Sequence, residues 1–220
     1  YYFFDKIDYY DSYKSNIMSY TELSKRFYEE EYKSFSDSRF CLWDSVKEFC
    51  DLFNKQDYVL DAGCGNGKNI SYYQTKCNII GIDLSKNLVN ICKERGYTVD
   101  VGNITNTEFK DNTFDYIISI AVIHHIEHET ERIKTIRELV RILKPNGKLL
   151  VTLWAYEGDI YSKKKKFKIG DNIIPFGKSK HQRYYYVYDQ SSCVNFCDKC
   201  DYPYEIKWER GNWILIFTKK

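Results

Sequence analysis

An acid and three alternating glycines stand directly after a short apolar run. The run 58–60 leads into Asp61, and glycines follow at every second position, at Gly63, Gly65 and Gly67. Glycine suits a turn that needs a positive φ and a ligand that approaches the backbone closely. The spacing differs from the dinucleotide loop and the P-loop, and the acid would repel a pyrophosphate but suit a ligand amino group. The plain alternative is a glycine-rich turn that binds nothing.

Further strands predicted along the chain also end in residues that suit a nucleoside-like ligand. Asp83 follows the glycine loop by about 20 residues, where an acid commonly accepts hydrogen bonds from both ribose hydroxyls. Asn103 offers an amide to an adenine edge, and Ile104 could cover the ring, while Ala121 ends the fourth strand. Because the carboxyl ends of parallel strands share one edge of a sheet, we expect these residues to form one site.

The pattern D-x-G-x-G-x-G after a strand resembles motif I of the class I methyltransferases that use S-adenosyl-L-methionine (SAM). The resemblance implies SAM as the cofactor. SAM gives up its methyl group by in-line displacement, and the enzyme mainly supplies proximity and orientation. The residues predicted to bind SAM are Asp61, Gly63, Cys64, Gly65, Asn66, Gly67, Asp83, Leu84, Asn103, Ile104 and Ala121.

The apolar pattern predicts the elements that hold this site. Strands are expected over residues 58–62, 78–82, 97–101, 114–121 and 148–154, with helices between them. Thr130 is predicted to cap the helix before the fifth strand, and residues 204–208 and 212–218 predict a closing hairpin. The fold class is therefore α/β and Rossmann-like: a mainly parallel seven-stranded sheet with helices on both faces and a C-terminal antiparallel hairpin.

Composition limits the domain count and the compartment. A chain of 220 residues with a formal net charge of +2 predicts one domain without a global drive toward nucleic acid. Residues 1–20 have no assigned role, 21–220 form the methyltransferase domain, and 155–200 are expected to be an acceptor-binding insertion. No run spans a membrane and no signal peptide pattern is present, so we expect a cytoplasmic protein with reduced thiols.

Cations and aromatic residues gather in the C-terminal third. A lysine cluster and an R-Y-Y stretch suit single-stranded nucleic acid, where bases stack on rings and phosphates pair with cations. A solvated loop is the plain alternative for the lysines. The residues predicted to contact the acceptor or tRNA are Lys163, Lys164, Lys165, Lys166, Tyr184, Tyr185, Arg210 and Trp213.

Three thiols, Cys193, Cys197 and Cys200, form C-x3-C-x2-C. With Asp198 or His181 they could hold zinc. No second C-x-x-C pair completes the signature, so free surface thiols and no metal site are predicted.

Several stretches together resemble the eukaryotic tRNA wobble-uridine methyltransferases that esterify 5-carboxymethyluridine at position 34. They are SRFCLW, LDAGCGNGK, GIDLSKNLVNICKERG, ISIAVIHHI, RELVRILKPNGKLLVTLWA, DNIIPF, QRYYYVY and ERGNWILIF, and they cover roughly residues 27–217 in order. The resemblance implies methylation of a carboxylate on the tRNA anticodon loop. It also implies a small zinc-binding activator subunit as the partner in a heterodimer. Asn103 departs from the family, which usually has an acid there.

Methylation of a carboxylate needs cations that bind the acceptor, and it needs no general base. A uridine carboxylate is already ionised at neutral pH, so a cationic clamp must hold it while its charge is lost. The resemblance places His125 and Arg183 nearest the acceptor and Arg39 near the mouth of the site, with His124 beside them.

Two other functions remain open from the sequence. A small-molecule methyltransferase, acting on a metabolite or quinone, would need an apolar acceptor pocket and no lysine cluster. A non-catalytic subunit that scaffolds RNA would not need the intact acids and glycines of the SAM site.

Overall fold

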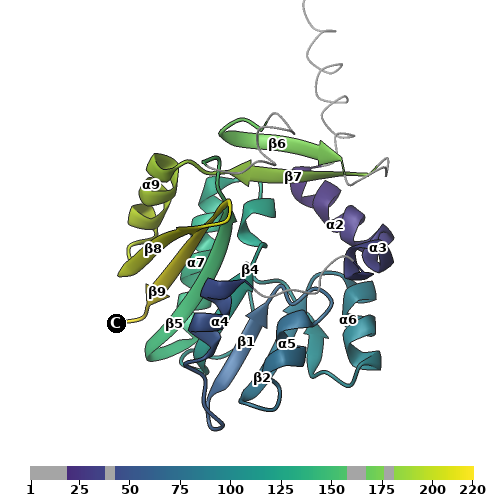
Figure 1. Ribbon diagram of the computed structural model, residues 1–220, viewed down its shortest axis with the longest axis vertical. Helices are drawn as coiled ribbons and strands as arrows, with labels where there is room; N and C mark the ends of the chain where they lie inside the picture. The colour runs from purple at the N-terminus through teal and green to yellow at the C-terminus, as the bar shows by residue number, and fades with distance from the viewer. Residues whose placement is uncertain (1–18, 38–42, 158–166, 176–180) are drawn as a thin grey trace, which may run out of the picture.

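The computed structural model describes residues 19–37, 43–157, 167–175 and 181–220. Figure 1 shows a central sheet flanked by helices. Its strands are β1 (Tyr58–Ala62), β2 (Asn78–Asp83), β3 (Val99–Val101), β4 (Phe114–Ile120), β5 (Leu143–Trp154), β8 (Tyr204–Glu209) and β9 (Asn212–Thr218). A smaller sheet pairs β6 (Gly170–Pro175) with β7 (Gln182–Val187) in antiparallel fashion.

The order of the large sheet is β3-β2-β1-β4-β5-β9-β8. Strands β1 to β5 run parallel, and β9 joins β5 antiparallel before β8 closes the hairpin. The predicted fold class is confirmed. Since β1 lies between β2 and β4, the residues that follow these three strands meet at one edge.

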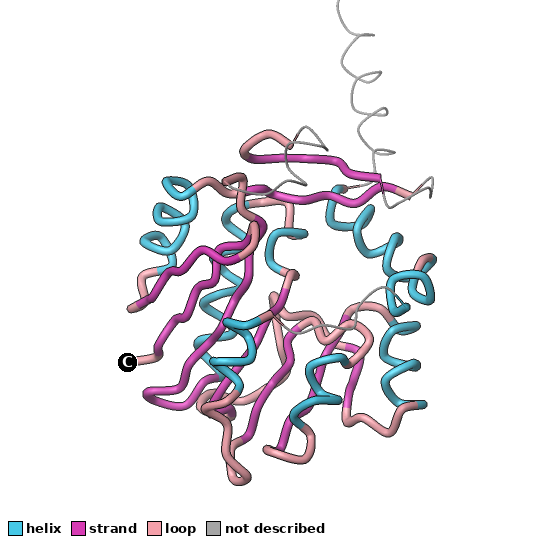
Figure 2. The backbone as a smooth tube through the Cα atoms, viewed as in Figure 1, coloured by secondary structure: helices cyan, strands magenta, loops and turns pink. Residues whose placement is uncertain are grey.

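Helices cover both faces of the sheet (Figure 2). They are α4 (Asp44–Cys50), α5 (Lys68–Tyr73) and α6 (Lys86–Glu94) on one face, and α7 (Glu129–Ile142) and α9 (Gln190–Cys200) on the other. Neighbouring residues of β1 serve the two faces in turn: Val59 packs with the first set and Leu60 with the second, both fully buried. A strand buried on both faces reads as a continuous apolar run, which is why β1 was predictable.

Some boundaries differ from the sequence prediction. Helix α7 begins at Glu129 with His128 as its N-cap residue, so the predicted cap at Thr130 is wrong. Glu129 and Glu131 occupy the first turn, where the helix dipole favours acids. Strand β5 begins at Leu143, which pairs with Phe114 across a bulge, and not at residue 148.

The segment between β5 and the hairpin is more regular than its composition indicates. Besides β6 and β7 it contains α9, whose N-cap Asp189 forms a reciprocal capping box with Ser192. Cys193, Cys197 and Cys200 lie on the buried stripe of this helix, with 0%, 1% and 0% exposure. The prediction of surface thiols is therefore wrong, because the three thiols fill core volume between α9 and the sheet.

The N-terminal described helices lie across the carboxyl edge of the sheet. Helix α2 (Tyr20–Glu30) is capped by Ser19 and followed by α3 (Tyr32–Asp37). Figure 1 shows α2 reaching from β7 toward α6. Ser24 Oγ accepts a hydrogen bond from the Tyr184 backbone N–H at 3.2 Å, which fixes α2 against β7. Within the described ranges no helix is long and apolar enough to cross a bilayer.

Candidate active site

The glycine loop has the backbone that its sequence predicts. Gly63 and Gly67 have φ values of 86° and 75°, in the left-handed region. A Cβ on Gly63 would lie 2.5 Å from a methyl of Val122, and one on Gly67 would lie 2.6 Å from the Tyr97 ring. Gly65 also has a positive φ, of 54°. Both the conformation and the close packing therefore require glycine at Gly63 and Gly67.

Asp61 lies fully buried beneath the loop. Its Oδ2 accepts a hydrogen bond from Asn69 Nδ2 at 3.1 Å, while its Oδ1 has no partner among the residues that the structure describes. Burial raises the pKa of Asp61 to about 7, against which the Asn69 hydrogen bond acts. A buried carboxylate oxygen in need of a donor fits the ammonium group of SAM.

Asp83 joins the first two strand ends. Its Oδ2 accepts the Gly65 N–H at 2.8 Å, and its Oδ1 accepts the Ser85 N–H at 2.9 Å. Burial raises the pKa of Asp83, and these backbone hydrogen bonds oppose that shift. Each oxygen keeps lone pairs for further donors, so the carboxylate fits a ribose diol. The next residue, Leu84, is 38% exposed.

The other predicted SAM residues occupy more varied surroundings. Asn66 donates to the Ser36 carbonyl at 3.1 Å, which ties the glycine loop to α3. Asn103 is exposed and its oxygen accepts from the Thr105 N–H, whereas Ile104 is buried in the core. Ala121 has a φ of 60° and donates its N–H to Thr152 Oγ1. Cys64, in the glycine loop, is buried. Their contacts with SAM remain predictions.

The histidine pair lies in a 3₁₀ turn, η1 (Ile123–His125), directly after β4. His125 Nδ1 is 2.7 Å from the Tyr184 carbonyl oxygen, which can only accept, so this nitrogen carries the proton. In the neutral ring, Nε2 then accepts the Tyr28 hydroxyl proton at 2.8 Å. Tyr28 was not predicted as a site residue, because it reaches His125 from 97 positions away and reads as part of a helical stripe.

His124 and Arg183 complete the cluster. His124 is fully buried, and its ring centroid lies 4.6 Å from that of His125 and 5.2 Å from that of Tyr185. The Arg183 guanidinium is 4.7 Å from the Phe27 ring and 5.1 Å from the Tyr185 ring, with 3% of the residue exposed. The structure thus brings together the two histidines and the arginine that the sequence singled out. Arg39 and residues 163–166 lie outside the described residues.

The aromatic residues predicted to stack on RNA bases are placed differently. Tyr184 is fully buried and its hydroxyl lies 2.6 Å from Asp171 Oδ1. Tyr185 stacks on Trp154 at 4.0 Å, and Trp213 donates its indole N–H to the Tyr188 carbonyl. These rings fill the core, so the expectation that Tyr184, Tyr185 and Trp213 form an open stacking surface does not hold. Arg210 is exposed on the hairpin and pairs with Asp44 at 2.9 Å.

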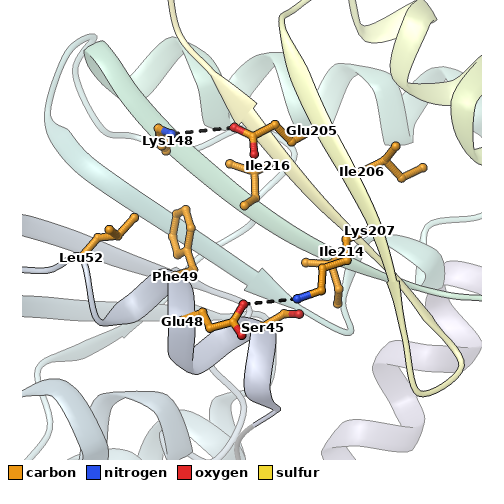
Figure 3. A pocket seen from close by; sticks show the side chains of 10 residues that line it. All are labelled: Ser45, Glu48, Phe49, Leu52, Lys148, Glu205, Ile206, Lys207, Ile214 and Ile216. Carbon is orange, nitrogen blue, oxygen red and sulfur yellow. Dashed lines mark hydrogen bonds and ion pairs between the residues drawn. The ribbon is translucent and has the colours of Figure 1, made fainter.

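A cavity of about 320 Å³ lies elsewhere, between α4 and strands β5, β8 and β9 (Figure 3). Phe49, Ile214 and Ile216 line it, and two ion pairs stand at its rim: Lys207 with Glu48 at 3.2 Å, and Lys148 with Glu205 at 3.9 Å. No predicted SAM or acceptor residue lines this cavity. Among the described residues, no group of three His, Cys, Asp or Glu side chains is arranged to hold a metal ion.

Comparison with known proteins shows the family. The family described as "Methyltransferase domain" matches residues 60–151, which run from β1 to β5. A relative from Encephalitozoon cuniculi, described as a "Putative methyltransferase", is 32% identical over 181 residues, covering 78% of this chain and 83% of that protein. The chain belongs to the class I SAM-dependent methyltransferases. SAM is therefore its cofactor, as the glycine loop predicted.

This methyltransferase is also related to enzymes named for tRNA modification. The tRNA (carboxymethyluridine(34)-5-O)-methyltransferase of Arabidopsis thaliana is 39% identical over 147 residues, which cover 65% of this chain and 36% of that protein. The chain thus spans little more than a third of that relative's length.

Solved structures support the fold. A chain from a complex between the Haloferax volcanii Trm112 methyltransferase activator and a methyltransferase has a TM-score of 0.63 and 14% identity, over 90% of this chain and 97% of that one. Phosphoethanolamine N-methyltransferase 2 of Haemonchus contortus, solved with SAM, has a TM-score of 0.64 and 19% identity, over 87% of this chain and 46% of that one.

Proposed function

We propose that this methyltransferase transfers the methyl group of SAM to the carboxylate of 5-carboxymethyluridine at tRNA wobble position 34, which yields the methyl ester. The observation that carries the proposal is the Arg183 guanidinium, buried beside the His124–His125 turn that follows β4. A guanidinium can hold a carboxylate through two parallel hydrogen bonds. The relation to the Arabidopsis enzyme supports the same acceptor.

The SAM side of the reaction rests on the first two strand ends. We assign Asp61 to the ammonium group of SAM and Asp83 to its ribose hydroxyls. The left-handed backbone at Gly63 forms the turn that follows Asp61, and a side chain there would collide with Val122. When bound, SAM supplies an electrophilic methyl group on a sulfonium.

On the acceptor side, this chain binds and orients an anion and needs no base. Arg183 holds the carboxylate so that one oxygen attacks the methyl carbon. The new O–CH3 bond forms as the S–CH3 bond breaks, and the products are the ester and S-adenosylhomocysteine. The buried rings around Arg183 keep water from that cation, which strengthens its pull on the carboxylate. His125 hydrogen-bonds with the Tyr28 hydroxyl and the Tyr184 carbonyl, and it forms a rigid side of this site.

A heterodimer with a small activator subunit is part of the proposal. The Haloferax volcanii structure, whose fold this chain shares, contains such an activator. Activity assays should therefore include a Trm112-type activator alongside the methyltransferase.

The function is tested by incubating the enzyme and activator with SAM and tRNA that carries 5-carboxymethyluridine. We expect a mass increase of one methyl group on that nucleoside, and none on matched tRNA with unmodified uridine at the same position. An enzyme that binds SAM but forms no ester on this tRNA would refute the proposed acceptor. Transfer instead to a metabolite or quinone would favour the small-molecule alternative.

The lysine cluster provides a second prediction. Replacing Lys163, Lys164, Lys165 and Lys166 with glutamine is expected to weaken tRNA binding and to reduce its salt dependence, because fewer counterions are released. The affinity for SAM should stay within about twofold. Filter binding across a salt series measures the effect. The control replaces four exposed lysines outside the cluster: Lys47, Lys93, Lys110 and Lys134. Equal tRNA affinity and salt slope in both variants would assign the cluster to a solvated loop.

A further inference from the structure

One buried arginine donates hydrogen bonds to the backbone directly after the histidine pair. Arg132, in the first part of α7, is 2% exposed. Its Nη1 donates to the Ile126 carbonyl at 2.8 Å and to the Glu127 carbonyl at 2.7 Å. Ile126 and Glu127 come directly after His125. A single guanidinium therefore fixes the direction of the two peptide groups that lead out of η1.

The same side chain contacts the strand that carries Arg183. The Arg132 guanidinium carbon lies 4.0 Å from the centroid of the Tyr186 ring, within cation–π range, and 5.8 Å from that of Tyr188. Arg132 also offsets part of the rise that burial causes in the pKa of Tyr188. The cation is therefore paired with carbonyl oxygens and with rings, and it connects the η1 turn to β7 and the residue after it.

Two further polar contacts connect the same segments. The Tyr184 hydroxyl lies 3.1 Å from the Glu127 carbonyl, and His125 Nδ1 donates to the Tyr184 carbonyl at 2.7 Å. The Glu127 carbonyl accepts from Arg132 and also lies next to the Tyr184 hydroxyl, whose single proton has a nearer acceptor in Asp171 Oδ1 at 2.6 Å. The relative position of His125 and Arg183 depends on this small network, since one lies on η1 and the other on β7.

We propose that Arg132 is a positioning residue for methyl transfer, which sets the His124–His125 turn against β7 so that the acceptor is aligned with the SAM methyl. Arg132 acts through backbone carbonyls and touches neither substrate. The proposal rests on the proposed function for its kinetic readout. An arginine that only stabilised the fold would change the melting temperature and leave the turnover of folded enzyme unchanged.

The test compares Arg132→Met with Arg132→Lys, using the full chain with its activator. Methionine matches the stem but cannot donate, and we expect kcat to fall roughly 10- to 100-fold, because misplacement of about 1 Å can cost that much. The dissociation constant for SAM should stay within about twofold. Lysine should restore part of kcat, since its ammonium can still donate to the carbonyls. The matched control is Arg137→Met, an exposed residue of α7 that also donates to a backbone carbonyl, and it should behave as wild type.

Hydrogen exchange supplies a readout that does not depend on the acceptor. In Arg132→Met, amides of residues 121–128 and 182–188 should exchange faster, while those of the glycine loop, 59–69, should not change. Wild-type kcat in Arg132→Met, or unchanged exchange in both segments, would overturn the proposal. If Arg132→Met does not fold, the lysine variant decides: wild-type kcat and exchange would overturn the proposal, and lowered kcat with unchanged SAM affinity would support it. A wild-type enzyme inactive on the modified tRNA would instead refute the proposed function, and the exchange data would still decide the role of Arg132.

Discussion

Asp61→Asn is expected to weaken SAM binding by about 100-fold while making the ligand-free protein more stable. The loss follows because the proposed charge-assisted hydrogen bond between the buried Asp61 carboxylate and the SAM ammonium is removed. The gain follows because the wild-type carboxylate is buried with Oδ1 lacking any described donor. The asparagine removes the buried charge and keeps an oxygen that can accept the hydrogen bond from Asn69 Nδ2. Calorimetric titration with SAM and thermal melting of the free protein measure the two effects.

The raised pKa of Asp61 determines how stability and SAM affinity should change with pH. Burial raises the pKa of Asp61 from 3.8 to about 7, so between these values the folded protein holds a proton that the unfolded chain has released. Ionisation of Asp61 therefore opposes folding, and its contribution to stability declines as the pH rises through this range and is level above it. SAM affinity should rise with pH up to about 7, because only the carboxylate attracts the ammonium.

Asp61→Asn should remove both dependences. Its melting temperature should exceed that of wild type by roughly 5 °C at pH 8, where the wild-type carboxylate is ionised. Asp100→Asn, at an exposed aspartate, is the control and should affect neither SAM affinity nor its pH profile. An Asp61→Asn protein that binds SAM as tightly as wild type would remove Asp61 from the SAM site.

Arg183→Met is expected to lower kcat/KM for the modified tRNA by about 1,000-fold with SAM affinity within about twofold of wild type. The reason is that a desolvated guanidinium attracts a carboxylate far more strongly than an exposed one, and methionine offers no donor. Arg183→Lys keeps the charge but not the paired donors, so an intermediate loss is expected. Steady-state kinetics with saturating SAM, together with SAM titration, provide the measurement.

The control for this prediction is Arg26→Met, at an exposed arginine of α2 that pairs with Glu30. It should leave kcat/KM near the wild-type value. If Arg183→Met kept full kcat/KM, or lost SAM affinity in proportion, Arg183 would not be the acceptor clamp.

Local sequence signals account for the parts of this protein that were predictable. The turn at Gly63 needs a positive φ. The alternating glycines Gly63, Gly65 and Gly67 after Asp61 already predict this turn from the sequence. Strand β1 and the closing hairpin follow from apolar runs and turn residues that lie within a few positions of each other. The shared edge of the sheet then follows from parallel order alone, which brings Asp61 and Asp83 together without knowledge of any side-chain contact.

The missed features depend on contacts between distant segments. In the sequence, Tyr28 looks like one more apolar residue of a helix. Its role appears only in the fold, because α2 packs on β7 and its Tyr28 contacts His125. Arg132 reads as a surface charge within a helix, because its two carbonyl partners come from a turn without a motif. Tyr184 lies in a stretch rich in cations and rings, and only its place in the small sheet shows that its ring is buried. The cysteines of α9 form a metal-like spacing that is also the spacing of one buried helix face.

The support for the methyl donor therefore differs from the support for the methyl acceptor. The likeness to solved structures lies below 20% identity for the two described above and supports the fold. The proposed acceptor rests on Arg183 and the His125 turn, and on the Arabidopsis relative, which is named for that tRNA reaction. Variants of Asp61 and Arg183 separate these two halves, because one should change SAM affinity and the other should spare it.

The most direct test of the central claim is the chemical identity of the methylated product. Wild-type enzyme with a Trm112-type activator, SAM and tRNA bearing 5-carboxymethyluridine should yield a nucleoside that is one methyl group heavier. Mild alkali should return it to the starting carboxylate, as it does for an ester. A methyl group that resists alkali, or one found on another nucleoside of the tRNA, would contradict carboxylate methylation at the wobble uridine.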